Sequence, residues 1–218
     1  MTLTEAEKLQ LEGLLHSNIC WDDPLLSLFK NKIKEEFLTE IKQCCYCARS
    51  FHGEFKFVID IEHILPKSLF RKQMLDVANL SIACKRCNMM IKKDRIDFLD
   101  GLLSDVADFF KNNKSENDRE NFLKDLGDMI FKDSCLIFSK SEYYKFIHPN
   151  LDEYYSHLDI EEIRKKGNIF KKYYPEDSKG LYTYEYFKLK ELEQGDLNSF
   201  QGIEFQANNS SLILNEII

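Results

Sequence analysis

Two Cys-x-x-Cys pairs constrain the fold of this 218-residue chain more than any other feature of its sequence. Cys44 and Cys47 form the first pair, Cys84 and Cys87 the second, and thirty-six residues lie between the pairs. The two-residue spacing lets both sulfurs of a tight turn reach one ion, and four thiolates complete a tetrahedral zinc site. The sequence therefore predicts a structural zinc that holds two distant loops together.

Cys45 leaves room for a second ligand assignment in the first pair, with Cys45 and Cys47 as the ligands. We assign Cys44 and Cys47, because their spacing suits a tight turn, and we expect Cys45 to be a packed thiol. The alternative for the whole set is ordinary buried thiols. Disulfides are disfavoured: the polar N-terminus has no apolar signal segment, and seven cysteines then indicate a reducing, cytoplasmic setting.

A histidine preceded by a carboxylate lies in segment 58–68, between the two cysteine pairs. His63 has an intrinsic pKa near neutrality, which suits a general base that takes a proton from water. In an extended segment Glu62 and His63 point to opposite sides unless the strand bends, whereas Asp60 shares the side of Glu62. The alternatives are a hydrogen-bonded core histidine and, for Asp60, a solvated acidic residue.

The order of these motifs resembles the HNH endonuclease domain of the zinc-containing ββα-metal class. Such domains show CxxC, a carboxylate-His-Ile-x-Pro strand, Asn-Leu, and CxxCN followed by Lys, and residues 42–95 contain all of these in that order. The variants CCYC, IEHILPKS and NL…CKRCN also resemble the PtuB-like nuclease family of Septu and Septu-type retron anti-phage systems. That family works beside an ABC-type ATPase. The resemblance, over a quarter of the chain, implies metal-dependent hydrolysis of DNA with nucleic acid and an ATPase as partners.

The resemblance also implies roles for individual residues. Glu62 and Asn88 would bind a catalytic Mg²⁺ or Mn²⁺, since both ions favour oxygen ligands. His63 would face the scissile phosphate, and Asn79 would brace the loop that orients it. Asp60 is an additional candidate ligand. The family more often has Asp before the histidine and His at the last position, so the metal preference stays open.

Two other functions share part of this pattern. A zinc-dependent module that binds nucleic acid or protein without cutting has no need of Glu62, His63 and Asn88. An enzyme that cleaves RNA, such as tRNA, shares every active-site residue, and the sequence does not separate it from a DNA nuclease.

The charge of the chain is unevenly distributed. The net charge is −7, yet residues 42–95 contain eleven Lys and Arg against five Asp and Glu, while the remainder carries a net charge of −13. Positive charge on the segment that holds the motifs is typical of phosphate binding, although a solvated basic face has the same composition. The residues expected to contact nucleic acid are Lys67, Arg71, Lys85, Arg86, Lys92, Lys93 and Arg95.

Hydrophobic periodicity predicts an α+β fold with three parts: an N-terminal helical segment (1–41), the nuclease core (42–98) and a mostly helical extension with short strands (99–218). In the first part we expect helices over 3–15 and 24–42, the second capped by Asp23 before Pro24. Its core-facing residues would be Leu25, Leu28, Phe29, Ile33, Phe37 and Ile41. The core would have strands over 55–61 and 79–83 and a helix over 88–98.

The extension is acidic and rich in aromatic residues, which suits either a protein-binding surface or an ordinary scaffold. We expect helices over 95–112 and 119–133, strands over 168–175, 181–189 and 202–206, and an apolar tail over 213–218. His148, Asp152 and His157 are a weak candidate for a second metal site, and hydrogen-bonded histidines among aromatic rings are the favoured interpretation. The sequence contains no apolar run long enough to span a bilayer.

Overall fold

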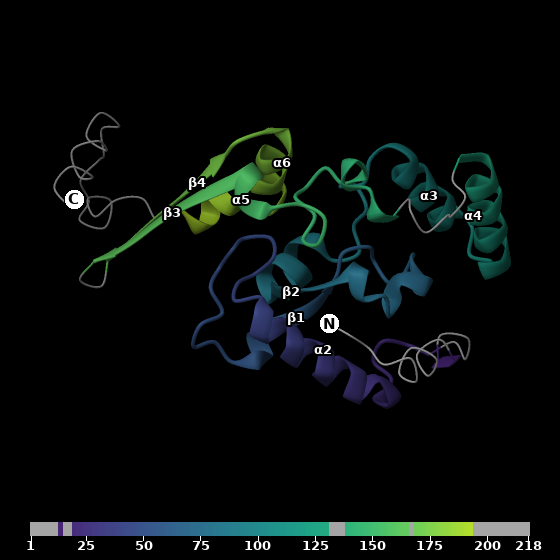
Figure 1. Ribbon diagram of the computed structural model, residues 1–218, viewed down its shortest axis with the longest axis horizontal. Coiled ribbons are helices and arrows are strands. Elements are labelled where there is room, and N and C mark those ends of the chain that lie inside the picture. Colours follow the sequence, from purple (N-terminus) through teal and green to yellow (C-terminus); the bar gives the residue numbers. More distant parts are fainter. Residues whose placement is uncertain (1–12, 15–18, 131–137, 166–167, 194–218) are drawn as a thin grey trace.

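The computed structural model describes residues 13–14, 19–130, 138–165 and 168–193, and mixes helices with two small antiparallel sheets (Figure 1). The main elements are α2 (Ser27–Glu40), β1 (Ile59–His63), β2 (Leu80–Cys84), the π-helix η5 (Arg86–Lys92), α3 (Gly101–Asn112), α4 (Glu116–Ile130), α5 (Tyr154–His157), β3 (Leu158–Lys165), β4 (Asn168–Pro175) and α6 (Ser178–Tyr186). Single 3₁₀ turns include η1 (Pro24–Leu26), η2 (Lys56–Val58), η3 (Arg71–Met74), η4 (Val77–Asn79), η7 (Ser141–Tyr143) and η8 (Leu189–Leu192). The predicted mixture of helices and short strands is confirmed. None of the described helices has the length and apolar character needed to cross a membrane.

The N-terminal helix begins at the predicted cap. The Asp23 carboxylate accepts a hydrogen bond from the Leu25 N–H, and Pro24 opens the 3₁₀ turn η1 before α2. This turn has three residues per turn rather than 3.6, so it changes which side chains face inward. Leu26 is buried, whereas Leu25 and Leu28 are 68% and 82% exposed. The prediction that Leu25 and Leu28 face the core is therefore wrong. The predicted helix over 3–15 lies outside the described residues, apart from 13 and 14.

The segment 42–98 contains a β1–β2 hairpin followed by the helix η5. The strands pair antiparallel, with Glu62 opposite Ser81 and His63 opposite Leu80. β1 begins at Ile59 rather than at residue 55, because the preceding residues form the 3₁₀ turn η2. The predicted helix over 88–98 instead begins at residue 86 and ends at Lys92, because Lys93 adopts a left-handed conformation with φ of 53°.

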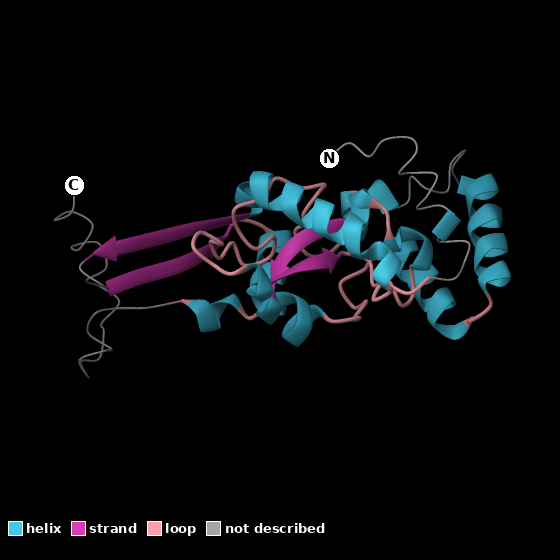
Figure 2. Ribbon diagram, turned by 90° about the horizontal axis from the view of Figure 1, so that it is seen from below, coloured by secondary structure: helices cyan, strands magenta, loops and turns pink. Residues whose placement is uncertain are grey.

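The extension contains the predicted helices α3 and α4 and the predicted strand β4. Its long β3–β4 hairpin projects away from the rest of the molecule (Figures 1 and 2). The predicted strand over 181–189 is wrong: α6 covers most of it, because the Asp177 carboxylate caps the helix by accepting from the Gly180 N–H. The segments 202–206 and 213–218 lie outside the described residues.

Aromatic side chains of segment 42–98 and of the C-terminal extension pack in one hydrophobic core. Tyr46 stacks on Phe187 with ring centroids 4.2 Å apart, and Phe98 stacks on Phe146 at 4.3 Å. Stacked aromatic pairs contribute beyond their buried area. The extension therefore packs directly against the loop that carries the first cysteine pair.

Candidate active site and metal site

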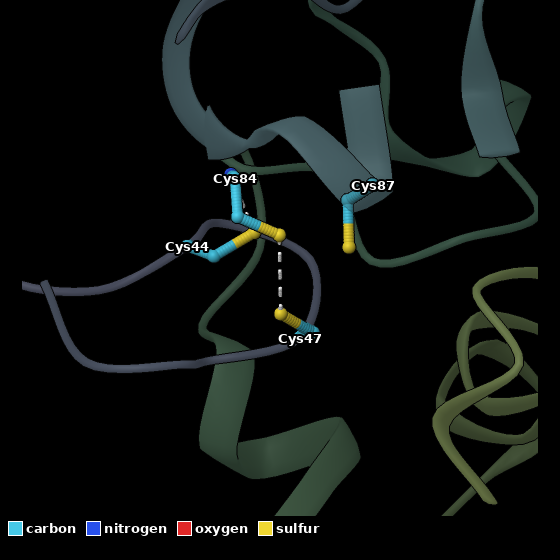
Figure 3. Close-up of side chains that lie close together, drawn as sticks. All are labelled: Cys44, Cys47, Cys84 and Cys87. Carbon is cyan, nitrogen blue, oxygen red and sulfur yellow. Dashed lines mark hydrogen bonds between the residues drawn. The ribbon is translucent and has the colours of Figure 1, made fainter. Parts of the chain in front are cut away.

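The four predicted zinc ligands converge on one point (Figure 3). The sulfurs of Cys44, Cys47, Cys84 and Cys87, here called the cysteine cluster, lie within 4.8 Å of one another, and all four residues are buried. The Cys47 and Cys84 sulfurs are 3.8 Å apart. A tetrahedral site with Zn–S bonds of about 2.3 Å requires sulfur separations of about 3.8 Å. The donor set and its spacing therefore fit a structural zinc.

Local backbone geometry brings the cysteine cluster together. The loop that carries Cys44 and Cys47, here called the first knuckle, is closed by a hydrogen bond from the Ala48 N–H to the Cys44 carbonyl. Ala48 has a positive φ of 49°. Cys84 ends β2, and Cys87 lies in the first turn of η5. Burial tends to raise the pKa of the Cys44 thiol, but hydrogen bonds from neighbouring cysteines lower that pKa well below its usual value. Cys45 is only partly buried and packs against the hydrophobic core, as expected for a thiol outside the ligand set.

His63 lies at a cavity of 530 Å³ beside the hairpin. The cavity lining includes Trp21, Ile61, His63, Lys67, Arg71, Asn88 and Lys93. Side chains from the N-terminal segment, β1, the loop after β1 and η5 thus meet at one place. The cavity combines a histidine, an amide and several cations, which is a suitable composition for holding a phosphate group.

The histidine is held in one tautomer. Its Nε2 lies 3.0 Å from the Met74 carbonyl oxygen, which can only accept, so Nε2 carries the proton and Nδ1 keeps a lone pair. The edge of the Trp21 ring packs against the imidazole, with centroids 4.4 Å apart. Burial, assisted by the nearby Lys67 charge, lowers the pKa of His63 to about 3. The imidazole is therefore neutral near pH 7.

Asn79 holds the loop that contains the acceptor for His63. Its Oδ1 accepts from the Leu65 N–H at 2.7 Å, and its Nδ2 donates to the carbonyls of Leu65 and Gln73 at 3.2 and 3.0 Å. Gln73 immediately precedes Met74, whose carbonyl accepts from the histidine. These contacts tie the segment after β1 to the segment that ends at Met74.

Replacing Asn79 with Ala should lower both stability and any activity that needs an oriented His63. Three hydrogen bonds are lost and a buried N–H is left unpaired, a cost of about 1–3 kcal/mol. Thermal unfolding and cleavage rates measure the two effects. Asn150→Ala is a matched control, because Asn150 donates to the carbonyls of Ala78 and Leu80 but not to the loop that ends at Met74. An equal loss of activity in both variants would contradict a specific bracing role.

Glu62 does not reach the cavity. Its side chain is fully buried, with Oε1 2.7 Å from the Lys92 ammonium and 3.0 Å from the Tyr46 hydroxyl. Burial raises the pKa of Glu62, while Lys92 and Tyr46 oppose that shift. The strand alternation explains the placement, since Glu62 and His63 point to opposite sides of β1. The structure therefore does not bring Glu62 together with Asn88 as the resemblance implied.

Asp60 is the carboxylate that Asn88 contacts. The Asn88 amide nitrogen is 3.3 Å from Asp60 Oδ2, and the Lys85 ammonium is 2.7 Å from Oδ1. The Asp60 side chain keeps 20% of its surface exposed. Carboxylate and amide oxygens are donors that Mg²⁺ and Mn²⁺ favour. Asp60 is more accessible than Glu62, but it shares the side of β1 with Glu62 and is not among the described residues that line the His63 cavity.

The cations expected to contact nucleic acid separate into two groups. Lys67, Arg71 and Lys93 line the cavity, and Arg71 also donates to the Ile19 carbonyl at 2.9 Å. Lys85 and its ion-pair partner Asp60 are not among the described lining residues. Lys92 is 1% exposed, so the prediction that it contacts nucleic acid is wrong.

The other two predicted cations are engaged within the chain. Arg86 donates to the carbonyls of Phe187 and Lys188 and pairs with Glu191, which ties η5 to the extension. Arg95 pairs with Asp97 and lies over the Tyr186 ring at 4.5 Å. Neither lines the cavity.

Asp152 and His157 of the second candidate metal group lie 4.0 Å apart, from Oδ1 to Nε2, but each has a closer partner. His157 pairs with Asp177 at 2.6 Å, and Asp152 pairs with Lys179 at 2.7 Å. His148 accepts a hydrogen bond from the Asn150 N–H and packs against an aromatic ring. The favoured interpretation of hydrogen-bonded histidines is confirmed, and within the described part of the chain the cysteine cluster is the group arranged for a metal.

Comparison with known proteins agrees with the order of the motifs in residues 42–95. Residues 44–94 match the model of the HNH endonuclease family, which confirms the predicted resemblance for this segment. The chain is also similar to the Septu protein PtuB of Bacillus thuringiensis, with 30% identity over 86 residues. The matched region covers 39% of this chain and 31% of that protein, so the similarity spans less than a third of the relative's length. No solved structure matches the chain significantly.

Proposed function

We propose that this chain is a metal-dependent endonuclease that hydrolyses phosphodiester bonds in DNA as part of an anti-phage defence system. The observation that carries the proposal is the neutral His63 at a cavity that Asn88, three cations and two aspartates also line, within the segment that matches the HNH family. The similarity to a Septu protein supports the defence setting, and an ATPase partner is proposed on the same ground.

His63 acts as the general base. Its Nδ1 lone pair takes a proton from the attacking water, and the bond from Nε2–H to the Met74 carbonyl holds the ring and stabilises the imidazolium that forms. Lys67 and Arg71 hold the phosphate by charge-assisted hydrogen bonds. A pure binding module would need the cations but no oriented base.

Asp60 and Asn88 are the proposed ligands of the catalytic divalent ion. When bound, such an ion neutralises charge at the scissile phosphate and the leaving oxygen as a Lewis acid. Lys85 balances the Asp60 charge in the structure described here, at a distance of 2.7 Å. The proposal replaces the pair Glu62 and Asn88 with Asp60 and Asn88.

A pair of isosteric variants separates the two carboxylates. Asp60→Asn should weaken Mn²⁺ binding by about tenfold or more, which corresponds to about 1.4 kcal/mol, with little change in melting temperature. Glu62→Gln should leave Mn²⁺ affinity within about twofold but lower the melting temperature, because the buried Lys92 loses its counter-charge at a cost of about 3–5 kcal/mol. Titration with Mn²⁺ and thermal unfolding check both results. Weaker Mn²⁺ binding in Glu62→Gln and unchanged binding in Asp60→Asn would instead indicate that Glu62 is the metal ligand.

The function itself is tested by cleavage with the purified chain. Supercoiled plasmid, single-stranded DNA and tRNA are each incubated with Mg²⁺ or Mn²⁺, with and without an ATPase of the kind proposed as partner. We expect cleavage of DNA that requires the divalent ion and stops with EDTA. Cleavage of tRNA alone would replace DNA with RNA as the substrate. Binding without cleavage under every condition would overturn the proposed activity.

A further inference from the structure

The first cysteine knuckle contributes a side chain to the buried face of the hairpin. Tyr46 lies between Cys44 and Cys47, is fully buried, and donates its hydroxyl to Glu62 Oε1 at 3.0 Å. The stacked ring of Phe187 fixes the plane of the Tyr46 ring. A hydroxyl from the metal-binding loop therefore reaches the strand that carries His63.

Lys92 continues this connection to the histidine itself. Its ammonium is 2.7 Å from Glu62 Oε1 and 2.7 Å from the His63 carbonyl oxygen, and it lies 5.5 Å from the Phe98 ring centroid. The side chains of both Lys92 and Glu62 are almost completely inaccessible to solvent. The contacts run from Tyr46 through Glu62 and Lys92 to the backbone of His63.

Burying the charged side chains of Glu62 and Lys92 has a high desolvation free energy. Removing a carboxylate and an ammonium from water costs several kcal/mol each, and apolar residues of similar volume often stabilise a fold as well or better. Glu62 Oε2 has no hydrogen-bond partner within the described part of the chain, so the pair is not fully satisfied. An apolar core would not provide the geometry of this ion pair, in which the Lys92 ammonium is held between the Glu62 carboxylate and the His63 carbonyl oxygen.

We infer that Tyr46, Glu62 and Lys92 are positioning residues that fix the backbone of His63 and couple its orientation to the cysteine cluster. The catalytic consequence rests on the proposed function, since only a nuclease needs the base oriented toward a phosphate. The structural coupling does not rest on it. Glu62 thereby acts on the histidine through Lys92 rather than through a catalytic metal.

Tyr46→Phe removes one hydroxyl and keeps the ring. It should lower kcat for cleavage by roughly tenfold at unchanged KM and zinc content, because a small displacement of a general base lowers the reaction rate strongly. Tyr173→Phe is the matched control: its hydroxyl donates to the Cys47 carbonyl at 2.8 Å, in the same knuckle, but does not contact Glu62. It should leave kcat unchanged.

A second variant separates positioning from stability. Replacing both Glu62 and Lys92 with Met fills the same space without charge, so the melting temperature should be kept or raised while kcat falls by at least tenfold. Full kcat in this double variant, or in Tyr46→Phe, would overturn the inference.

The ring resonances of His63, followed by NMR on histidine-labelled protein, give a readout that needs no activity. They should shift in Tyr46→Phe and not in Tyr173→Phe. If the wild-type chain does not cleave nucleic acid, the proposed function fails, and the NMR comparison still decides the coupling. Identical His63 resonances in wild type and Tyr46→Phe would reject it.

Discussion

His63→Ala should reduce cleavage by two or more orders of magnitude while leaving the fold and the zinc content intact. A positioned general base contributes about 10²–10⁴-fold, and among the described residues His63 is the histidine that lines the cavity. Its side chain bonds to the Met74 carbonyl and packs against Trp21, which both lie outside the cysteine cluster, so its loss should leave that cluster intact. Single-turnover cleavage at saturating divalent ion, circular dichroism and metal analysis measure the three quantities.

His52→Ala is the matched control, because His52 is exposed and lies outside the cavity. It should cleave at the wild-type rate. Undiminished cleavage by His63→Ala would show that another group takes the proton from water. Misfolding or loss of zinc in that variant would make the histidine structural and remove the main support for a nuclease.

The same histidine should link stability to pH. Its pKa in the folded chain is lowered to about 3, mainly by burial, whereas an unfolded histidine has a pKa of about 6.5. Between these values the unfolded state binds more protons, so stability falls as pH decreases from about 6.5 toward 3. Above pH 6.5 the histidine makes no pH-dependent contribution. Melting temperatures of the wild type and His63→Ala should therefore converge on acidification, and parallel curves would contradict the burial of a neutral imidazole.

The sequence predicted what depends on local spacing. Two Cys-x-x-Cys turns specify ligand geometry by themselves, and the bracing role of Asn79 follows from a motif of fixed order. The environment of Glu62 was not predictable in this way. Its partner Lys92 lies on η5, and whether a lysine after Asn88 faces solvent or the hairpin depends on how that helix packs. Nothing in the charge pattern distinguishes the buried Lys92 from the cavity-lining Lys93 next to it.

The different burial of Asp60 and Glu62 could not be predicted from the sequence for a related reason. Alternation places Asp60 and Glu62 on one side of β1, but their burial differs with position along the hairpin. Glu62 lies deep between the strands and η5, while Asp60 lies where Lys85 and Asn88 approach and water has access. The acceptor for His63 is a main-chain carbonyl, that of Met74, and main-chain groups carry no sequence signature.

Cys87→Ser should release the metal and destabilise the whole HNH domain. Structural zinc binding is coupled to folding and is worth about 10–16 kcal/mol in small zinc domains, so loss of one thiolate should cost several kcal/mol. The effect should spread beyond the knuckle, because Tyr46 and Tyr173 join the first cysteine pair to the hairpin and to the extension. We expect less than half the wild-type zinc after dialysis and a melting temperature lower by about 10 °C or more.

Cys45→Ser provides the control within the same loop. Its sulfur lies outside the cysteine cluster, so the variant should keep about one zinc per chain and lose only a small apolar contact. Metal analysis after dialysis and thermal unfolding, performed on both variants side by side, decide the assignment. Loss of zinc in Cys45→Ser with retention in Cys44→Ser would establish the alternative pair of Cys45 and Cys47. Full zinc occupancy and an unchanged melting temperature in Cys87→Ser would show that a zinc bound by Cys87 does not hold the two knuckles together.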